Sequence, residues 1–267
     1  MIARCVSVLV LATLVAAPIV VAAAPAIDLA GHRALYELSM ASARGDVTAA
    51  TGTMAFEVTD ACDGWAVHQR LAMTVTNRDG QDIEMLSDYT TYETKDGASM
   101  RFRSRQTTEQ AVTSEVIGEA EMAADGGTVR YTLPDGVTKR LGKATLFPMA
   151  HTEAILKAAM AGKKFIEVPL FDGTGAEGAQ DSSVAISAWT GPQAGGALAG
   201  AWPDLAALGS ARVHVAFFEQ AAGAQQPEYE VSMRYFENGV ADELLMDFGD
   251  FSVRGKMKAF ELPKKGC

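Results

Sequence analysis

Cysteine is scarce in this chain, since its 267 residues include only three, and no two of them are close in sequence. The four histidines are also scattered, whereas protein zinc sites use closely spaced pairs of these residues. The motifs H-E-x-x-H and G-x-S-x-G are missing as well. The sequence therefore predicts no metal site, no cofactor and no catalytic residue, although a triad assembled from distant residues stays open.

Positive charge is in deficit. The chain has 23 lysines and arginines against 33 aspartates and glutamates, which gives a formal net charge of −10. Nucleic acids and anionic lipid surfaces are bound through clustered basic residues, because the phosphates must be neutralised. We therefore expect no nucleic-acid partner. The one basic row, Arg101, Arg103 and Arg105, is interpreted as a solvated strand face that pairs with nearby carboxylates, among them Glu84, Asp88 and Glu93.

Long apolar runs are missing after the first 24 residues. Val6–Val21 is apolar, Arg4 precedes it, and small alanines follow it. This pattern is typical of a secretory signal peptide, here residues 1–24 with cleavage between 23 and 26. A retained membrane anchor is the alternative, but the run is short for a membrane span. Residues 25–267 are predicted to form a single domain without a transmembrane segment.

Removal of the signal would take Cys5 with it and leave Cys62 and Cys267. An even number of cysteines in an exported protein is typical of a disulfide bond. A bond between these two would tie the last strand to the opening hairpin. Closing so long a loop would stabilise the fold by up to about 5 kcal/mol in the chain-entropy model. A free, buried thiol at Cys62 is the alternative.

Cys62 begins the sequence Cys62-Asp63-Gly64-Trp65, which lies between two alternating segments, 52–59 and 65–76. Glycine accepts positive φ and aspartate bonds its own backbone, so Asp63-Gly64 is predicted to form the turn. Trp65 is then expected to begin the next strand.

Apolar and polar residues alternate along most of the chain, and this period of two is typical of half-buried strands. Turns with glycine separate the segments, which indicates an antiparallel meander. We therefore predict an all-β, mainly antiparallel fold of about a dozen or more strands. The expected strands cover residues 32–40, 47–58, 65–76, 82–92, 99–107, 111–122, 128–133, 136–141, 164–171, 183–189, 212–220, 228–237, 240–248 and 251–262.

One helix is predicted over residues 148–161. Pro148 suits its first turn and Gly162 its end. Residues 172–181 are predicted to be a loop. They contain the pattern G-x-G-x-x-G, but the following residues alternate like a strand, whereas a dinucleotide fingerprint opens a helix. Residues 191–209, rich in glycine and alanine, are also predicted to be a loop.

Several stretches that span nearly the whole mature chain form a recognisable set. They are Leu29-Ala30-Gly31-His32-Arg33-Ala34-Leu35-Tyr36-Glu37-Leu38, Gly52-Thr53-Met54, Cys62-Asp63-Gly64-Trp65 with Gln69-Arg70, Phe147-Pro148 with His151-Thr152, Leu170-Phe171-Asp172-Gly173, and Cys267. In this order they resemble the EipB family of periplasmic cell-envelope integrity proteins. The resemblance implies a long sheet curled into an open β-spiral or broken barrel with one helix, and a disulfide between the early and terminal cysteines. It also implies a periplasmic protein that supports the envelope under stress, without catalysis.

A curled sheet has a concave face, and the helix is expected to cover its mouth. The candidate binding face comprises Tyr36, Leu38, Met54, Phe56, Leu71, Met73, Met149, Ile155, Leu156 and Met160. Its methionines suit a surface that adapts to its ligand. The alternative is that these residues are plain core.

Two classes of function follow. The first is a non-enzymatic envelope-integrity factor that binds a periplasmic protein partner. The second is a carrier of an apolar ligand, such as a lipid, an acyl chain or a lipoprotein, in an open-barrel cleft, by analogy of fold alone.

Overall fold

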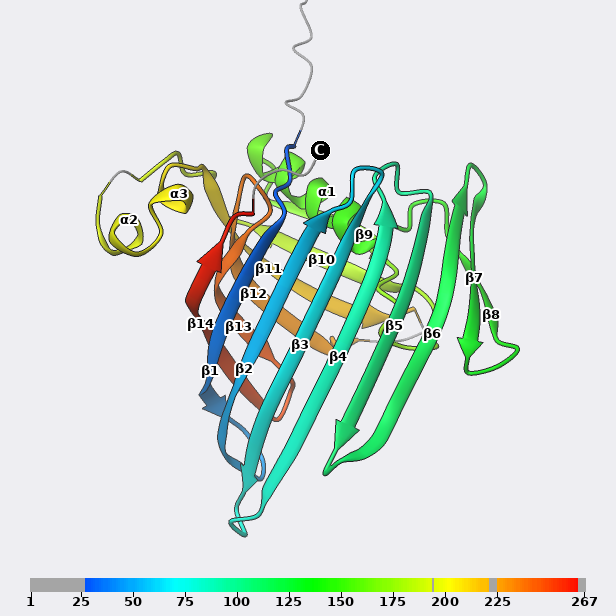
Figure 1. Cartoon of the computed structure of the whole chain (residues 1–267), viewed down its shortest axis with the longest axis horizontal. Helices are drawn as coiled ribbons and strands as arrows, with labels where there is room; N and C mark the ends of the chain where they lie inside the picture. The colour runs from blue at the N-terminus through cyan, green and yellow to red at the C-terminus, as the bar shows by residue number, and fades with distance from the viewer. Residues whose placement is uncertain (1–26, 194, 221–224, 264–267) are drawn as a thin grey trace, which may run out of the picture.

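The computed structural model describes residues 27–263, apart from 194 and 221–224. The predicted signal peptide and Cys267 lie outside these residues. Within them, fourteen strands form one antiparallel sheet, with three helices (Figure 1). The strands are β1 His32–Ala43, β2 Val47–Asp60, β3 Gly64–Asn77, β4 Asp82–Thr94, β5 Ser99–Thr108, β6 Ala111–Ala123, β7 Gly126–Leu133, β8 Thr138–Leu141, β9 Phe165–Leu170, β10 Gln180–Ile186, β11 Ser210–Glu219, β12 Tyr229–Phe236, β13 Ala241–Asp247 and β14 Phe251–Glu261. The helices are α1 Pro148–Met160, α2 Ala197–Ala201 and α3 Pro203–Ala206.

The strand order is β8-β7-β6-β5-β4-β3-β2-β1-β14-β13-β12-β11-β10-β9. The first and last strands are therefore neighbours in the middle of the sheet, where Arg33 of β1 lies opposite Glu261 of β14. The two edge strands, β8 and β9, are the strands that flank α1 in sequence.

The sheet curls so that two groups of strands face each other. In Figure 1, β1–β6 form the near side, which we call the front wall, and β9–β13, the back wall, cross behind it. Helix α1 lies across one end of the space between them. The prediction of an antiparallel sheet curled into an open, spiral barrel is confirmed.

Alternation along each strand places one face inside this space. In β1, for example, His32, Ala34, Tyr36 and Leu38 are buried and the residues between them are exposed. The largest apolar cluster joins β1, β2 and β3 to β12, β13 and β14, the central strands of the sheet. Its members include Tyr36, Leu38, Met54, Met73, Phe236, Leu244, Met246, Val253 and Met257.

Helix α1 matches the predicted helix within one residue. Pro148 occupies its first turn, and Gly162, at φ 73°, follows its end. Ile155 packs with the valines of β10 and β11, whereas Leu156 packs with β2 and β3. The helix therefore fills one end of the barrel by contacting both walls.

The prediction of a single helix is wrong, because residues 191–209 also contain α2 and α3. Alanine and leucine favour helix, and Pro203 stands at the first turn of α3. Leu205 is fully buried in the largest apolar cluster, which anchors this segment. Strand β10 also begins three residues earlier than predicted, since Gln180 and Asp181 pair with β11. None of the helices in the described part is long and apolar enough to cross a membrane.

Candidate functional site

The turn between β2 and β3 differs from the prediction in which residue takes positive φ. Cys62 does so, at 73°, and Gly64 does not. The Cys62 N–H donates to Asp60 Oδ1 at 3.0 Å, which holds this conformation. Gly64 is required for space instead, because a Cβ there would lie 2.6 Å from the Tyr92 ring. Since Cys267 lies outside the described residues, the bond from it to Cys62 stays a prediction.

Trp65, which follows Gly64, connects the turn between β2 and β3 to the end of β4. Lys95 Nζ lies 4.8 Å from the centre of the Trp65 ring and 2.6 Å from Asp60 Oδ1. The Tyr92 hydroxyl donates to Asp63 Oδ1 at 2.5 Å. These contacts fix the mouth of the barrel where α1 begins.

Glu93 of β4 caps α1 from the front wall. Its side chain is 2% exposed, and its oxygens accept the backbone N–H groups of Met149 at 2.8 Å and Ala150 at 2.9 Å. The first N–H groups of a helix have no partner within it, so Glu93 supplies the cap that the side chain of Phe147 does not. Burial raises the pKa of Glu93 to about 7, against the two hydrogen bonds, which lower it.

The prediction that Glu93 pairs with the arginine row is wrong. Glu93 lies opposite Met100 in the sheet and points inside, whereas the arginines alternate with Met100 and point outside. Arg103 pairs instead with Glu115 of β6 at 2.8 Å.

His151, in the same turn of α1, reaches the back wall. Its Nε2 lies 2.8 Å from Ser182 Oγ, and this hydroxyl donates to the Val168 carbonyl at 2.7 Å. A serine hydroxyl has one proton, so Nε2 of His151 must be the donor in the shared hydrogen bond. Burial lowers the pKa of His151 to about 4, which keeps the ring neutral at pH 7. Glu93, His151 and Ser182 together form a polar clamp that holds α1 to both walls.

A cleft of about 310 Å³ opens beside the clamp, between α1 and the turn after β4. It is mixed in character: Trp65 and Phe147 are apolar, and Glu93, Asp96 and Glu153 supply carboxylates. Its two lysines are already paired, Lys95 with Asp60 and Lys157 with Glu153. Within residues 27–263, as far as they are described, no three His, Cys, Asp or Glu side chains gather as a metal site would require.

The ten residues of the candidate binding face do not form one exposed surface. The strand members Tyr36, Leu38, Met54 and Met73 are at most 7% exposed within the largest apolar cluster. The helix members divide between other clusters: Met149 and Leu156 face the front wall, and Ile155 faces the back wall. Three of the ten are partly exposed, namely Phe56, Leu71 and Met160.

Phe56 and Leu71 do belong to a group of partly exposed apolar residues on the inner face. Their neighbours in the largest cluster include Tyr229, Val231 and Met233 of the back wall, which are also only partly buried. We call these five residues the inner patch. The predicted binding face includes the front-wall half of this patch but not the half on β12, because the alternation of β12 predicts a strand and does not show that it faces Phe56 and Leu71.

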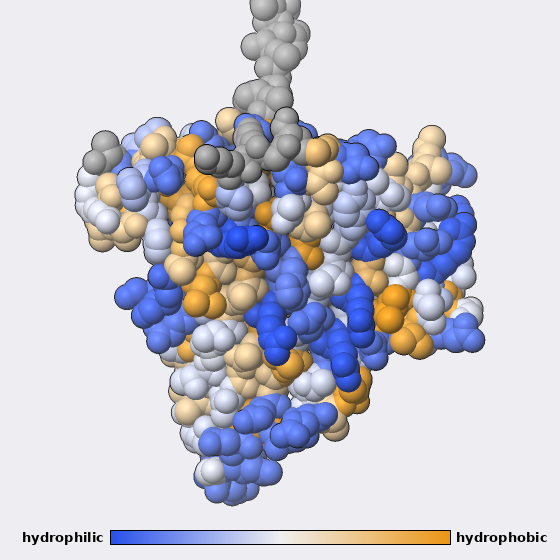
Figure 2. Space-filling model, viewed as in Figure 1, coloured by the Kyte–Doolittle hydropathy of each residue, from blue (hydrophilic) through white to orange (hydrophobic). Residues whose placement is uncertain are grey.

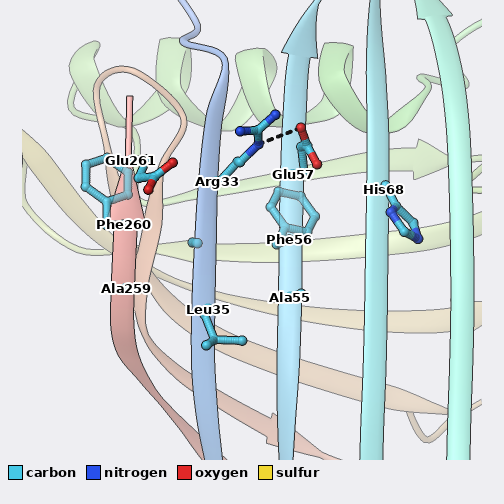
Figure 3. A pocket seen from close by; sticks show the side chains of 10 residues that line it. Arg33, Leu35, Ala55, Phe56, Glu57, His68, Ala259, Phe260 and Glu261 are labelled. Atoms are coloured by element: carbon cyan, nitrogen blue, oxygen red, sulfur yellow. Dashed lines mark hydrogen bonds and ion pairs between the residues drawn. The ribbon is translucent and has the colours of Figure 1, made fainter. Parts of the chain in front are cut away.

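A second hollow lies on the outer face, over β14, β1, β2 and β3 (Figure 3). We call it the outer hollow; its volume is about 280 Å³. Leu35 lies in it with Ala55 and Ala259 directly opposite on the neighbouring strands. Arg33 and Glu57 pair at 2.7 Å beside it, as the dashed line in Figure 3 shows. The sequence signal was available, since Leu35 is apolar at an outward position between two inward ones.

Comparison with known proteins places this chain in a family. A family model described as EipB-like matches residues 23–264. The cell envelope integrity protein EipB of Brucella abortus (strain 2308) is 31% identical over 92% of this chain and 90% of its own length. A crystal structure of a beta-barrel-like protein of a domain of unknown function, also from Brucella abortus, aligns with a TM-score of 0.82 and 26% identity, over 90% of this chain and 100% of that one. This chain, with its open spiral sheet and its capped helix, therefore belongs to the EipB-like family.

Proposed function

We propose that this protein works in the periplasm to support the integrity of the cell envelope, and that it acts by binding a protein partner rather than by catalysis. The observation that carries the proposal is the 31% identity, over nearly the full length of both chains, to a protein named for cell envelope integrity. The apolar run before residue 25 supports export.

The geometry of the polar clamp supports a role without catalysis. His151 and Ser182 are a histidine and a serine in contact, the pair that a hydrolase would use. Here the serine proton goes to the Val168 carbonyl, and the histidine donates to the serine instead of accepting from it. Both side chains are at least 94% buried, so a substrate has no access to them. The pair holds α1 in place.

Deletion of the gene tests this proposal. We expect the deletion strain to lose viability on detergent or on an antibiotic that attacks the cell wall, and the full-length gene to restore growth. A gene without codons 2–24 is the matched control, and it should fail to restore growth because its product stays in the cytoplasm. Growth of the deletion strain equal to the parent under these stresses would contradict the proposal.

The inner patch favours a second function, the binding of an apolar ligand between the walls. Phe56 and Leu71 on one wall, and Val231 and Met233 on the other, point inward without being fully buried. Apolar side chains on a concave surface are typical of ligand sites. Mass spectrometry of lipid extracted from protein purified from the periplasm tests this function, and extracts that match a periplasmic control protein would contradict it.

A further inference from the structure

The outer face of the front wall is covered mainly by charged and polar side chains, and smaller hydrophobic patches lie between them (Figure 2). The register explains the pattern. One row across the strands reads Glu261, Arg33, Glu57 and His68, and all four side chains point outward. Such rows of opposite charges keep a sheet face in water and discourage association.

Leu35 interrupts this pattern. It is 41% exposed and is one of few large apolar side chains so exposed in the described residues. Its neighbours in register, Ala55 and Ala259, are too small to cover it, and this leaves the outer hollow beside it. The hollow has room for about one large side chain from outside.

The charges on the two sides of the hollow are not equivalent. On one side two carboxylates, those of Glu57 and Glu261, flank the single guanidinium of Arg33, which pairs with Glu57 at 2.7 Å, so this side carries a net negative charge. On the other side two ammonium groups, those of Lys258 and Lys256, flank the single carboxylate of Glu37, which pairs with Lys258 at 2.8 Å, so this side carries a net positive charge. Among the described residues, neither Glu261 nor Lys256 makes an ion pair within 4 Å.

The spacing of these two charges is fixed by β14. Glu261 lies two residues from Ala259 on one side. On the other side β14 has an extra residue between Ala259 and Met257, which pair with Leu35 and Tyr36, so Lys256 lies opposite Glu37, two positions beyond Leu35 on β1. At about 3.3 Å per residue, each charge stands roughly 7 Å from the centre of the hollow along the sheet. An extended segment laid along β14 would therefore meet a negative charge, an apolar hollow and a positive charge in this order.

We propose that the outer hollow is the docking surface for an extended segment of a partner protein. The segment carries a large apolar residue that fills the hollow against Leu35. A basic residue two positions away on one side meets Glu261, and an acidic residue two positions away on the other side meets Lys256, because residues two apart in an extended segment share a face. This inference rests on the proposed function, because it names the kind of partner through which the protein supports the envelope.

Selection from a phage-displayed library of random 12-residue peptides on the immobilised mature protein tests the inference. We expect recovered peptides to share a large apolar residue with a basic and an acidic residue at these spacings, on opposite sides. Recovery should fall at least tenfold on Leu35→Asp. The matched control is Leu133→Asp on β7, because Leu133 is 40% exposed but far from the hollow in the strand order, and recovery there should stay unchanged.

Two further variants test whether Glu261 and Lys256 select the charges of the bound peptide. Glu261→Lys should replace the basic preference by an acidic one while the apolar residue is kept, and Lys256→Glu should do the reverse on the other side. If Leu35→Asp fails to fold, Ala55→Phe fills the hollow from within and should abolish recovery in its place. Peptides without a common pattern, or recovered equally on Leu35→Asp, would overturn the proposal.

Complementation separates this inference from the proposed function. If the deletion strain is sensitive to envelope stress and Leu35→Asp restores growth as well as the unchanged protein, the docking surface is wrong and the function stands. If the deletion strain is not sensitive at all, the function itself fails. We expect Leu133→Asp to complement and Leu35→Asp to fail.

Discussion

The front wall and the back wall both contain ion pairs, but the pairs differ in their exposure to water. Arg103 and Glu115 on the front wall lie 2.8 Å apart, with side chains 56% and 27% exposed. Arg234 and Asp242 on the back wall make two bonds, at 2.8 and 2.7 Å, with side chains 11% and 9% exposed. Water competes for the first pair and scarcely reaches the second. An arginine–carboxylate pair on the front wall therefore keeps that face hydrated, whereas removal of one partner on the back wall leaves a buried charge unpaired.

The largest effect is expected from Arg234→Ala. It leaves the Asp242 carboxylate buried without its partner, which typically costs about 3–5 kcal/mol of unfolding free energy. Urea unfolding of the protein without residues 1–24 measures the loss. The double variant Arg234→Met with Asp242→Leu is the control, because it removes both charges and should recover most of the stability. A loss below about 1 kcal/mol in Arg234→Ala would show that water reaches the pair.

The next effect concerns Cys62. Glu261 is opposite Arg33, which is opposite Glu57, so β14 ends about 10 Å across the sheet from β2. The six residues from Glu261 to Cys267 can span up to about 20 Å, which brings the last residue within reach of the β2–β3 turn. We expect Cys62→Ser to lower the unfolding free energy by about 2–5 kcal/mol. Thiol titration of denatured, unreduced wild-type protein checks the bond itself, and two reactive sulfhydryls would exclude it.

The polar clamp permits a comparison within one helix turn, because its two titratable groups respond to pH in opposite directions. Burial raises the pKa of Glu93 from 4.5 to about 7, so the folded state holds this proton longer than the unfolded state. The contribution of Glu93 to stability is therefore lost as pH rises from 4.5 to 7. Burial lowers the pKa of His151 from 6.5 to about 4, so its contribution is lost as pH falls from 6.5 to 4.

Between pH 4.5 and 6.5 the two contributions should cancel, and the stability of the wild-type clamp should change little. Glu93→Gln removes the titration of Glu93 and leaves that of His151. The unfolding free energy should then rise with pH by about 1.4 kcal/mol per pH unit in this window. His151→Asn leaves only the titration of Glu93, so the unfolding free energy should fall with pH by a similar amount per pH unit. Chemical unfolding at pH 4.5, 5.5 and 6.5 measures both slopes. Parallel slopes in the two variants would mean that neither group is buried as described.

The antiparallel strands could be predicted because most of them carry their own alternation and most turns contain a glycine, although Glu109 and Gln110 form the turn between β5 and β6 without one. Tyr36 and Leu38, for example, could be assigned to the inside from β1 alone. The curl of the sheet into an open spiral was predicted only from the resemblance to a family. The clamp could not be predicted, because Glu93 is 56 residues away from the N–H group of Met149 that it caps. Its position in an alternating strand shows which face it occupies only once the register with β5 is known. The helix members of the binding face were divided for the same reason: α1 contacts two walls, and no pattern along one helix reveals that.

The smallest effect is expected on the front wall, and it completes the comparison with Arg234. Arg103→Ala removes the bond to Glu115, but both side chains remain in water, so we expect a loss of about 0–1 kcal/mol. The contribution should shrink further in 1 M salt, where the screening length is about 3 Å. The stability loss caused by Arg234→Ala should depend much less on salt, because protein surrounds this pair and keeps salt ions away from it. Urea unfolding of both variants at low and high salt measures the difference. Equal losses and equal salt dependence in the two variants would mean that burial does not separate the two walls.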